Sequence, residues 1–321
     1  MMRWLIGLLV LLGSLMSLPA QAGCLTLTIK NLTVTQTFAG GTAEYNPFDT
    51  STYTQTVSFD VYGGSTSVAC TYFLVLGAGG SGNANARTMA LGGSTLSYNA
   101  YLPSGSTIFS DLGTATLSSI ITGTFAALAT NATNHHSFTW TITPQQIKAA
   151  TTSRYSDSAT LSLYTGVLNL VYLQVDTKTI TFQSKVDSNV NLSLVDSGSA
   201  FNIGSNLKTI DFGSMTSGTV RTFDIVVRSN DGYKVSLQSA NKQNMVYSDS
   251  AAYSDKVPYA FKVNGAVVDL STGLPVSPVA VTGTTSSSGV AMPVVVTLGT
   301  RTGNETAGNY KDTVTVSVIA N

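Results

Sequence analysis

Charge is what this sequence has least of. Only 10% of its 321 residues are Asp, Glu, Lys or Arg, and the formal net charge is zero, whereas an average soluble domain has about 25% charged residues. A protein that binds nucleic acid needs a basic face. The composition therefore argues against nucleic acid as a partner and against electrostatic docking on a membrane.

Acids and histidines are too few to form a recognisable active site. Glutamate occurs only as Glu44 and Glu305, and the only histidines are His135 and His136. Adjacent histidines on a strand point to opposite faces, and no Cys or carboxylate ligand accompanies them. The Gly-rich stretch 77–82 lacks the Lys of a phosphate-binding loop, and no serine lies in a nucleophile-elbow motif. We expect no catalytic residue, no metal and no cofactor, so a secreted hydrolase is a poorly supported alternative.

The chain begins with an export signal, residues 1–22. Arg3 supplies the positive start, Leu5 to Leu18 the apolar stretch, and Ala20-Gln21-Ala22 the cleavage site. Cleavage would leave a mature chain that starts at Gly23-Cys24. A lipoprotein signal with an acylated Cys24 is a rival reading, but Gln21 stands where such signals carry an aliphatic residue.

Cysteine is nearly absent as well, with two residues, Cys24 and Cys70. In an exported protein an isolated pair predicts a disulfide, because the compartment is oxidising. Such a bond would contribute about 4 kcal/mol in the chain-entropy description.

What the sequence does contain is short alternating segments between Gly, Asn and Ser turns, with 29 glycines in all. This pattern predicts an all-β fold of two immunoglobulin-like antiparallel β-sandwiches. One motif, Tyr-x-Asp-Ser/Thr-x-Thr-aliphatic-Ser-aliphatic, occurs at 155–163 and again at 310–318. The repeat indicates a duplicated domain. We place the two domains at residues 23–175 and 176–321.

The second copy of the motif ends the sequence. There Val314, Val316 and Val318 alternate with Thr and Ser, as in a half-buried strand. We expect the C-terminal domain to lack its last strand and to offer these three valines as the edge that accepts a strand from another chain. Donating a strand would need about ten extended residues at the N-terminus, and only Gly23 precedes Cys24, so we expect this chain at the end of a polymer. The first domain has Val167–Val175 available to complete itself.

Several motifs resemble one known family. Gly308-Asn309-Tyr310-Lys311-Asp312-Thr313-Val314-Thr315-Val316 is similar to the terminal signature of the spore coat protein U family, the subunits of archaic chaperone–usher pili. The segment 207–213, the motif 98–101 and the early cysteine pair fit the family too, and the resemblance extends over essentially the whole mature chain in two copies.

The resemblance implies both a way of assembly and a place. A periplasmic pilus chaperone would lend the missing strand, an outer-membrane usher would receive the subunit, and the N-terminal donor strand of an adjacent pilin would replace the chaperone. A two-domain member resembles a tip adhesin, exported through the periplasm to the cell surface, that attaches the cell to surfaces and supports biofilm formation. The alternative is a structural pilus or spore/outer coat subunit with no ligand.

The adhesive loops are predicted from strand parity. If the strand Asp157–Leu163 runs toward the second domain, the loops 38–53 and 144–154 and the loop after Thr71–Leu76 lie at the free pole of the first. The candidate adhesive residues are the apolar members of these loops: Phe38, Tyr45, Phe48, Tyr53, Met89, Leu91 and Ile147. On a nearly uncharged domain they predict a water-excluding contact with an abiotic or host surface. It stays open whether the aromatic loop 38–53 instead packs onto the sandwich.

Overall fold

The computed structural model describes residues 23–35 and 44–321. These residues form two compact units. Unit 1 holds Thr50–Gln146 and Ser153–Lys185 together with the first strand, and unit 2 holds Val186–Asn321 together with the short segments Asn46–Asp49 and Ile147–Thr152. The predicted export signal and Phe38 lie outside the described residues. Across the described part, no helix is long and apolar enough to cross a membrane.

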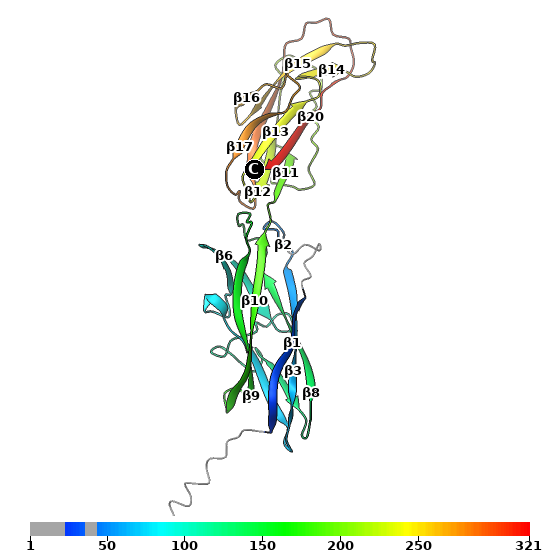
Figure 1. Cartoon of the computed structure of the whole chain (residues 1–321). Coiled ribbons are helices and arrows are strands. Elements are labelled where there is room, and N and C mark those ends of the chain that lie inside the picture. Colours follow the sequence, from blue (N-terminus) through cyan, green and yellow to red (C-terminus); the bar gives the residue numbers. More distant parts are fainter. Residues whose placement is uncertain (1–22, 36–43) are drawn as a thin grey trace, which may run out of the picture. The chain divides into compact units, whose positions relative to one another are not determined.

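Unit 1 is built from antiparallel strands, as the alternating pattern predicts (Figure 1). Its elements are β1 (Cys24–Thr35), β2 (Glu44–Tyr45), β3 (Tyr53–Ser65), β4 (Cys70–Leu76), the 3-10 turn η1 (Gly79–Ser81), β5 (Thr88–Leu91), β6 (Ser94–Tyr101), β7 (Ile121–Phe125), β8 (Ala132–Ile142), β9 (Tyr155–Gly166) and β10 (Tyr172–Val186). The sheet order is β1-β3-β8-β6-β5-β9-β10-β2, and β4 pairs with both β7 and β9. The ring of Phe182 on β10 lies 5.3 Å from that of Trp140 on β8, so the part of this path that holds β8 faces the part that holds β10, as the two layers of a sandwich.

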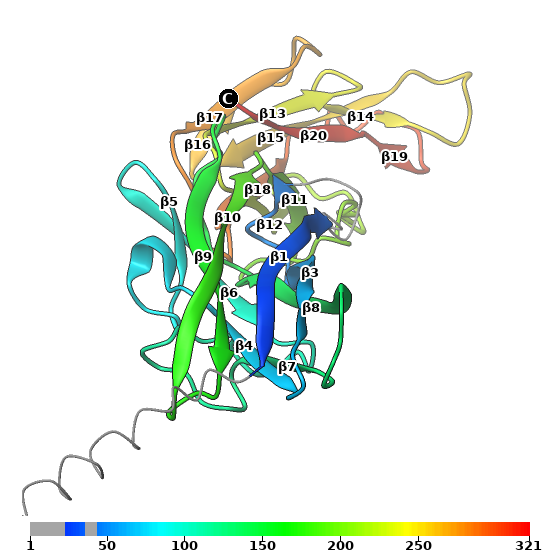
Figure 2. The same cartoon turned by 60° about the horizontal axis from the view of Figure 1, so that its bottom comes forward.

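Unit 2 is a second sandwich. Its strands are β11 (Val190–Val195), β12 (Val220–Ser229), β13 (Tyr233–Ser239), β14 (Asn244–Tyr247), β15 (Lys256–Val263), β16 (Ala266–Val268), β17 (Val276–Val281), β18 (Val290–Leu298), β19 (Tyr310–Lys311) and β20 (Val314–Ala320). One sheet has the order β11-β12-β18-β15-β14-β19 with β16 beside β15, and the other has the order β17-β13-β20. Figure 2 shows β20 at the rim of unit 2, alongside β13. The predicted all-β sandwich fold is confirmed.

The cores follow from the period-two patterns. On β3 the alternate residues Val57, Phe59 and Val61 are buried, and on β13 Val235 and Leu237 are buried in the same way. Burying each such side chain contributes about 1.5–3 kcal/mol. The cores therefore determine which face of each strand points inward.

The predicted disulfide is confirmed. Cys24 at the start of β1 is bonded to Cys70 at the start of β4, and neither cysteine is free. The Cys24 thiol is therefore not available for acylation.

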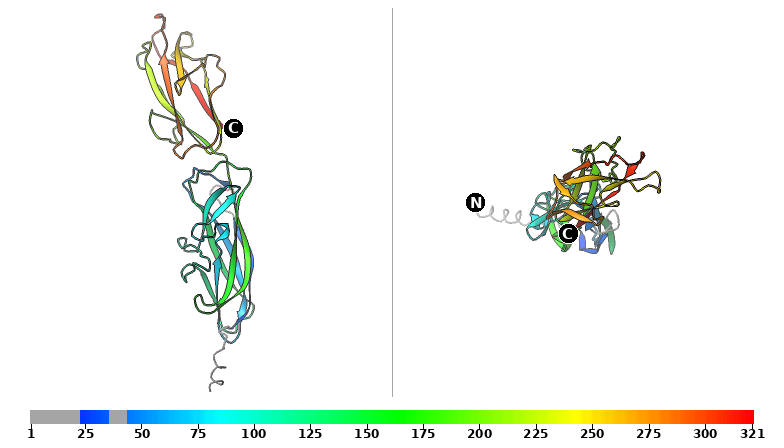
Figure 3. Two further views of the ribbon diagram at one scale, coloured as in Figure 1. Left: turned by 90° about the vertical axis from the view of Figure 1, so that its left-hand side faces the viewer. Right: turned by 90° about the horizontal axis from the view of Figure 1, so that it is seen from above.

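The predicted boundary after Val175 is wrong by about ten residues. β10 runs unbroken from Tyr172 to Val186 and pairs with β9 along its length, so the division falls at Lys185/Val186. The segment Thr179–Phe182 belongs to unit 1, where Ile180 and Phe182 are buried. Strand β10 is thus the strand that completes unit 1 (Figure 3).

Candidate functional site: an open groove in unit 2

The two copies of the repeated motif form β9 in unit 1 and β19–β20 in unit 2. In unit 1, β9 lies between β4 and β10, and its inward residues Ala159, Leu161 and Leu163 are fully covered. A strand with neighbours on both edges has its backbone groups paired. Unit 1 is therefore complete.

In unit 2, β20 pairs with β13 alone among the described strands. Its inward residues Val314, Val316 and Val318 pack against the core but are only half-buried. Along the edge of β20 that faces away from β13, no strand of the described ranges takes the place that β10 has in unit 1. An uncovered edge beside an apolar face is the arrangement to which a further strand adds.

A cavity of about 340 Å³ opens beside this edge. It lies between β20 and the irregular segment 207–212, which follows β11, and its floor includes Met245, Tyr259 and Val296. Val314 and Val316 line the cavity, whereas Val318 does not. The cavity therefore lies beside the first part of β20.

One end of the groove is defined by a tyrosine–aspartate pair in which Tyr259 is buried and Asp312 is half-buried. The Tyr259 hydroxyl donates to Asp312 Oδ2 at 2.6 Å, and Ser239 Oγ donates to the same oxygen at 2.6 Å. The backbone N–H of Asn241 donates to Asp312 Oδ1 at 3.0 Å. Burial and the neighbouring carboxylate both raise the pKa of Tyr259. The pair is satisfied internally, so it positions β19–β20 and leaves the groove apolar.

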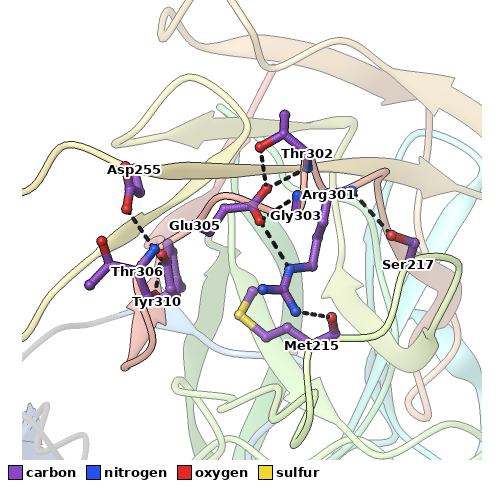
Figure 4. A network of polar contacts seen from close by, with 9 residues as sticks. All are labelled: Met215, Ser217, Asp255, Arg301, Thr302, Gly303, Glu305, Thr306 and Tyr310. Atoms are coloured by element: carbon purple, nitrogen blue, oxygen red, sulfur yellow. Dashed lines mark hydrogen bonds and ion pairs between the residues drawn. The ribbon is translucent and has the colours of Figure 1, made fainter.

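A polar network around Glu305 ties the loop before β19 to the segment around Met215 (Figure 4). The Glu305 carboxylate accepts hydrogen bonds from the Thr302 and Gly303 N–H groups at 2.6 and 2.9 Å and lies 3.6 Å from Arg301 Nε. Arg301 Nη1 donates to the Met215 carbonyl at 3.0 Å, and so reaches the segment that continues from 207–212. The network thus joins the loop before β19 to the chain that follows one wall of the groove.

The same hydrogen bonds determine the pH range over which the Glu305 carboxylate stays ionised and holds the network together. Backbone N–H groups, first its own and then that of Thr302, lower the pKa of Glu305 to about 2 from an ordinary 4.5. A lowered pKa stabilises the folded state above the ordinary value, and this stabilisation is lost as the pH falls through the lowered one. The network is therefore intact at neutral pH and weakens only below about pH 4.

A different surface, in unit 1, carries exposed apolar side chains on three loops. The loops 66–69, 126–131 and 167–171 are neighbours at one pole: the Leu128 N–H donates to the Thr66 carbonyl at 2.6 Å, and Tyr72, just after the first loop, lies opposite Thr165, just before the third. The exposed apolar residues are Val68 (58%), Leu128 (72%), Leu170 (77%) and Val171 (59%). We call this surface the apolar pole.

The predicted adhesive residues do not belong to the apolar pole. Tyr45, Phe48, Tyr53 and Met89 are at most 6% exposed, and Leu91 and Ile147 are half-buried. Tyr45 and Tyr53 form an edge-on ring pair at 5.1 Å. The described part of the aromatic loop therefore packs onto the protein, which was the alternative left open, and its assignment as adhesive is wrong.

The pole prediction is wrong for one topological reason. The chain turns after β9 and returns along β10, so β10, not β9, leads to unit 2. Tyr53 lies opposite Ile142, and Tyr155 opposite Ser184, which puts the residues just before Tyr53 and the loop 144–154 at the end where β10 finishes. The apolar pole is the opposite end of unit 1.

The histidines lie on β8 beside a shallow hollow of about 720 Å³. His135 Nδ1 is 2.6 Å from Asp60 Oδ1, and Asn31 Nδ2 donates to Asp60 Oδ2 at 2.7 Å. These hydrogen bonds, the one from Asn31 first, lower the pKa of Asp60. His136 points to the other face, where its Nε2 lies 2.9 Å from the Tyr72 hydroxyl. Within the described ranges no group of three His, Cys, Asp or Glu is placed to hold a metal.

Sequence reasoning missed the groove floor and the apolar pole. Asp312 lay in the motif already singled out, but nothing in the sequence pairs it with Tyr259 across 53 residues. The sequence does hold one signal for the apolar pole, Leu168-Asn169-Leu170, because Asn between apolar residues favours a turn. Asn169 adopts the positive φ of 64° that suits such a turn.

No protein-family model matches this chain, and no curated protein does. Solved structures with a similar fold include a chain of the CsuC–CsuE chaperone–tip adhesion subunit complex of Acinetobacter baumannii, with 14% identity, a TM-score of 0.42, and coverage of 92% of this chain and 91% of that one. The CupB6 tip adhesin of Pseudomonas aeruginosa has 10% identity and a TM-score of 0.35, over 92% and 94% of the two chains. CfaE, the adhesive subunit of CFA/I fimbria of enterotoxigenic Escherichia coli, has 11% identity and a TM-score of 0.30, over 92% and 81%.

Proposed function

We propose that this chain is a non-enzymatic adhesin subunit of a chaperone–usher pilus, and that unit 2 is incorporated by accepting a β-strand from another protein. The observation that carries the proposal is the apolar groove beside β20. In unit 1 the equivalent strand is covered by β10. The same fold thus occurs once complete and once open in one chain.

The size of the groove makes the partner strand energetically important. A strand that buries three or four aliphatic side chains there would contribute roughly 5–10 kcal/mol of gross apolar burial, less the cost of ordering it. That is comparable with the whole stability of a domain. The exported subunit therefore needs a periplasmic chaperone to lend a strand, an usher to receive it, and the donor strand of an adjacent pilin to replace the chaperone.

Attachment is the role we propose for the apolar pole of unit 1. Exposed clusters of large apolar side chains are uncommon on monomers and are usually functional. If the chain were a coat subunit without a ligand, the exposure of Val68, Leu128 and Leu170 on three neighbouring loops would serve no binding role. We place this chain at the pilus tip on the cell surface, where the pole meets abiotic or host surfaces, because unit 1 is already complete and needs no further strand.

The test of strand acceptance is a pair of neighbouring substitutions on β20. Val316→Asp puts a charge in the groove, whereas Thr315→Asp puts the same charge on the outer face, since Val316 points inward and Thr315 outward. The chain is co-expressed with a periplasmic chaperone of a chaperone–usher pilus system that binds it. We expect Val316→Asp to lose at least 90% of the co-purified chaperone and Thr315→Asp to retain it. Equal recovery of chaperone with both variants would contradict strand acceptance through this groove.

A further inference from the structure

The duplication makes unit 1 a template for the strand that unit 2 lacks. Residues of β9 correspond to those of β19–β20 through the shared motif, so that Asp157 corresponds to Asp312 and Ala159 to Val314. The sheet registers agree: Ala90 lies opposite Ser156 and Val246 opposite Lys311.

The side chains around this point correspond as well. Met89 and Met245 occupy the same place, one residue before Ala90 and Val246. The Tyr98 hydroxyl donates to Asp157 Oδ2 at 2.7 Å, as the Tyr259 hydroxyl donates to Asp312. The two units therefore share a tyrosine–aspartate pair and a methionine at the same end of the same strand.

In unit 1 this place is filled by one aromatic side chain from β10. Phe182 lies directly opposite Asp157, and Ile180 lies opposite Ala159. The Phe182 ring is 5.1 Å from the Tyr98 ring and 5.3 Å from the Trp140 ring. Phe182 and Ile180 are at most 2% exposed, so they are the residues through which β10 closes the core.

In unit 2 the equivalent place is the cavity. Its lining includes Met245, Tyr259, Asp312 and Val314, the counterparts of the residues around Phe182 and Ile180. Val296 stands where unit 1 has Trp140, because Trp140 pairs with the second residue after Tyr98 and Val296 with the second residue after Tyr259. The space that Phe182 fills in unit 1 is thus open in unit 2.

We infer that the strand completing unit 2 runs antiparallel to β20 and places a bulky apolar side chain, best an aromatic one, opposite Asp312 and an aliphatic one opposite Val314. This inference rests on the proposed function and adds the orientation, the register and the side-chain class of the donor. The half of the donor strand that lies opposite Val316 and Val318 is less constrained in its side chains. In unit 1 the positions opposite Leu161 and Leu163 are held by Lys178 and Asp176, which are not buried.

The chain itself supplies the reagent for a test. Gly166 corresponds to Asn321 in the shared motif, so appending a second copy of residues 167–186 after Asn321 reproduces the β9–β10 turn and register in unit 2. We expect the extended mature chain to be a soluble monomer whose unit 2 melts about 10 °C or more above that of the parent chain, from the added apolar burial. Amide exchange of β20 should slow at the same time, because its free edge becomes paired.

Variants of the appended copy test the register. Phe182→Ala in that copy should remove at least half of the gain in Tm, while Thr181→Ala, the neighbour on the outer face, should leave the gain unchanged. Deleting one residue of the appended turn should abolish the gain, because a slip of one residue turns every side chain to the other face.

The outcomes separate the inference from the proposed function. Equal losses for Phe182→Ala and Thr181→Ala, or a slipped copy that stabilises as well as the aligned one, would overturn the register while leaving strand acceptance intact. No stabilisation and no slowing of exchange by the aligned copy would overturn the antiparallel arrangement. The chaperone experiment with Val316→Asp, which uses no appended strand, then decides whether strand acceptance fails too.

Discussion

Arg87 shows how a chain with so few charges uses one of them. Its guanidinium is fully buried in unit 1 and donates hydrogen bonds to the carbonyls of Leu76, Gly77, Ala84 and Phe109. A fifth bond reaches Asn99 Oδ1 at 2.7 Å. Burial lowers the pKa of Arg87, but its five donors are satisfied by fixed acceptors. A side chain with fewer donors would leave buried carbonyls unpaired.

This gives a prediction at the scale of one residue. Arg87→Met keeps much of the volume but removes every donor, and we expect it to destabilise unit 1 by about 3 kcal/mol. Arg154→Met, at an exposed position, serves as the control and should change stability by less than about 0.5 kcal/mol. Urea unfolding of the mature chain measures both. Equal stability of the two variants would show that the hydrogen bonds of Arg87 do not support the fold.

At the scale of elements, the β9–β10 hairpin explains what could and could not be predicted. The alternation of Val314, Val316 and Val318 was readable because three of the four inward positions of β20 are valine and the fourth is Ala320. β10 was not readable as one strand, because its inward positions change from Asp176 and Lys178 at one end to Ile180 and Phe182 at the other. The sequence pattern therefore split it between two domains.

Because the reversal between β9 and β10 was not predicted, the predicted adhesive loops were assigned to the wrong pole of unit 1. The disulfide, by contrast, was predictable because only the compartment and the even count were needed. Burial of the aromatic loop was not, because it depends on contacts such as the bond from the Tyr45 hydroxyl to the Thr143 carbonyl at 3.1 Å, which joins residues 98 positions apart.

At the scale of the whole molecule, we propose attachment for unit 1 and assembly for unit 2, so the two roles should be separable. We expect the fourfold variant of the apolar pole, with Val68, Leu128, Leu170 and Val171 changed to Ser, to abolish at least 90% of cell attachment to polystyrene while pili still assemble. The control changes Val267 and Leu274, exposed apolar residues of unit 2, to Ser and should leave attachment unchanged. Undiminished attachment by the fourfold variant, with pili counted by electron microscopy, would show that the pole is not the adhesive surface.

Unit 1 is closed by its own strand β10, and we propose that the open unit 2 is closed by a strand from another protein. Amide hydrogen exchange of the mature chain, alone and bound to the pilus chaperone, tests this claim most directly, because β9 and β20 are matched strands in one molecule. In the chain alone, β9 should be strongly protected and β20 should exchange at least 100-fold faster, a gap of about 2.7 kcal/mol in opening free energy. On binding, β20 should approach the protection of β9. Protection of β20 equal to that of β9 in the free monomer, or no change on binding, would contradict the account.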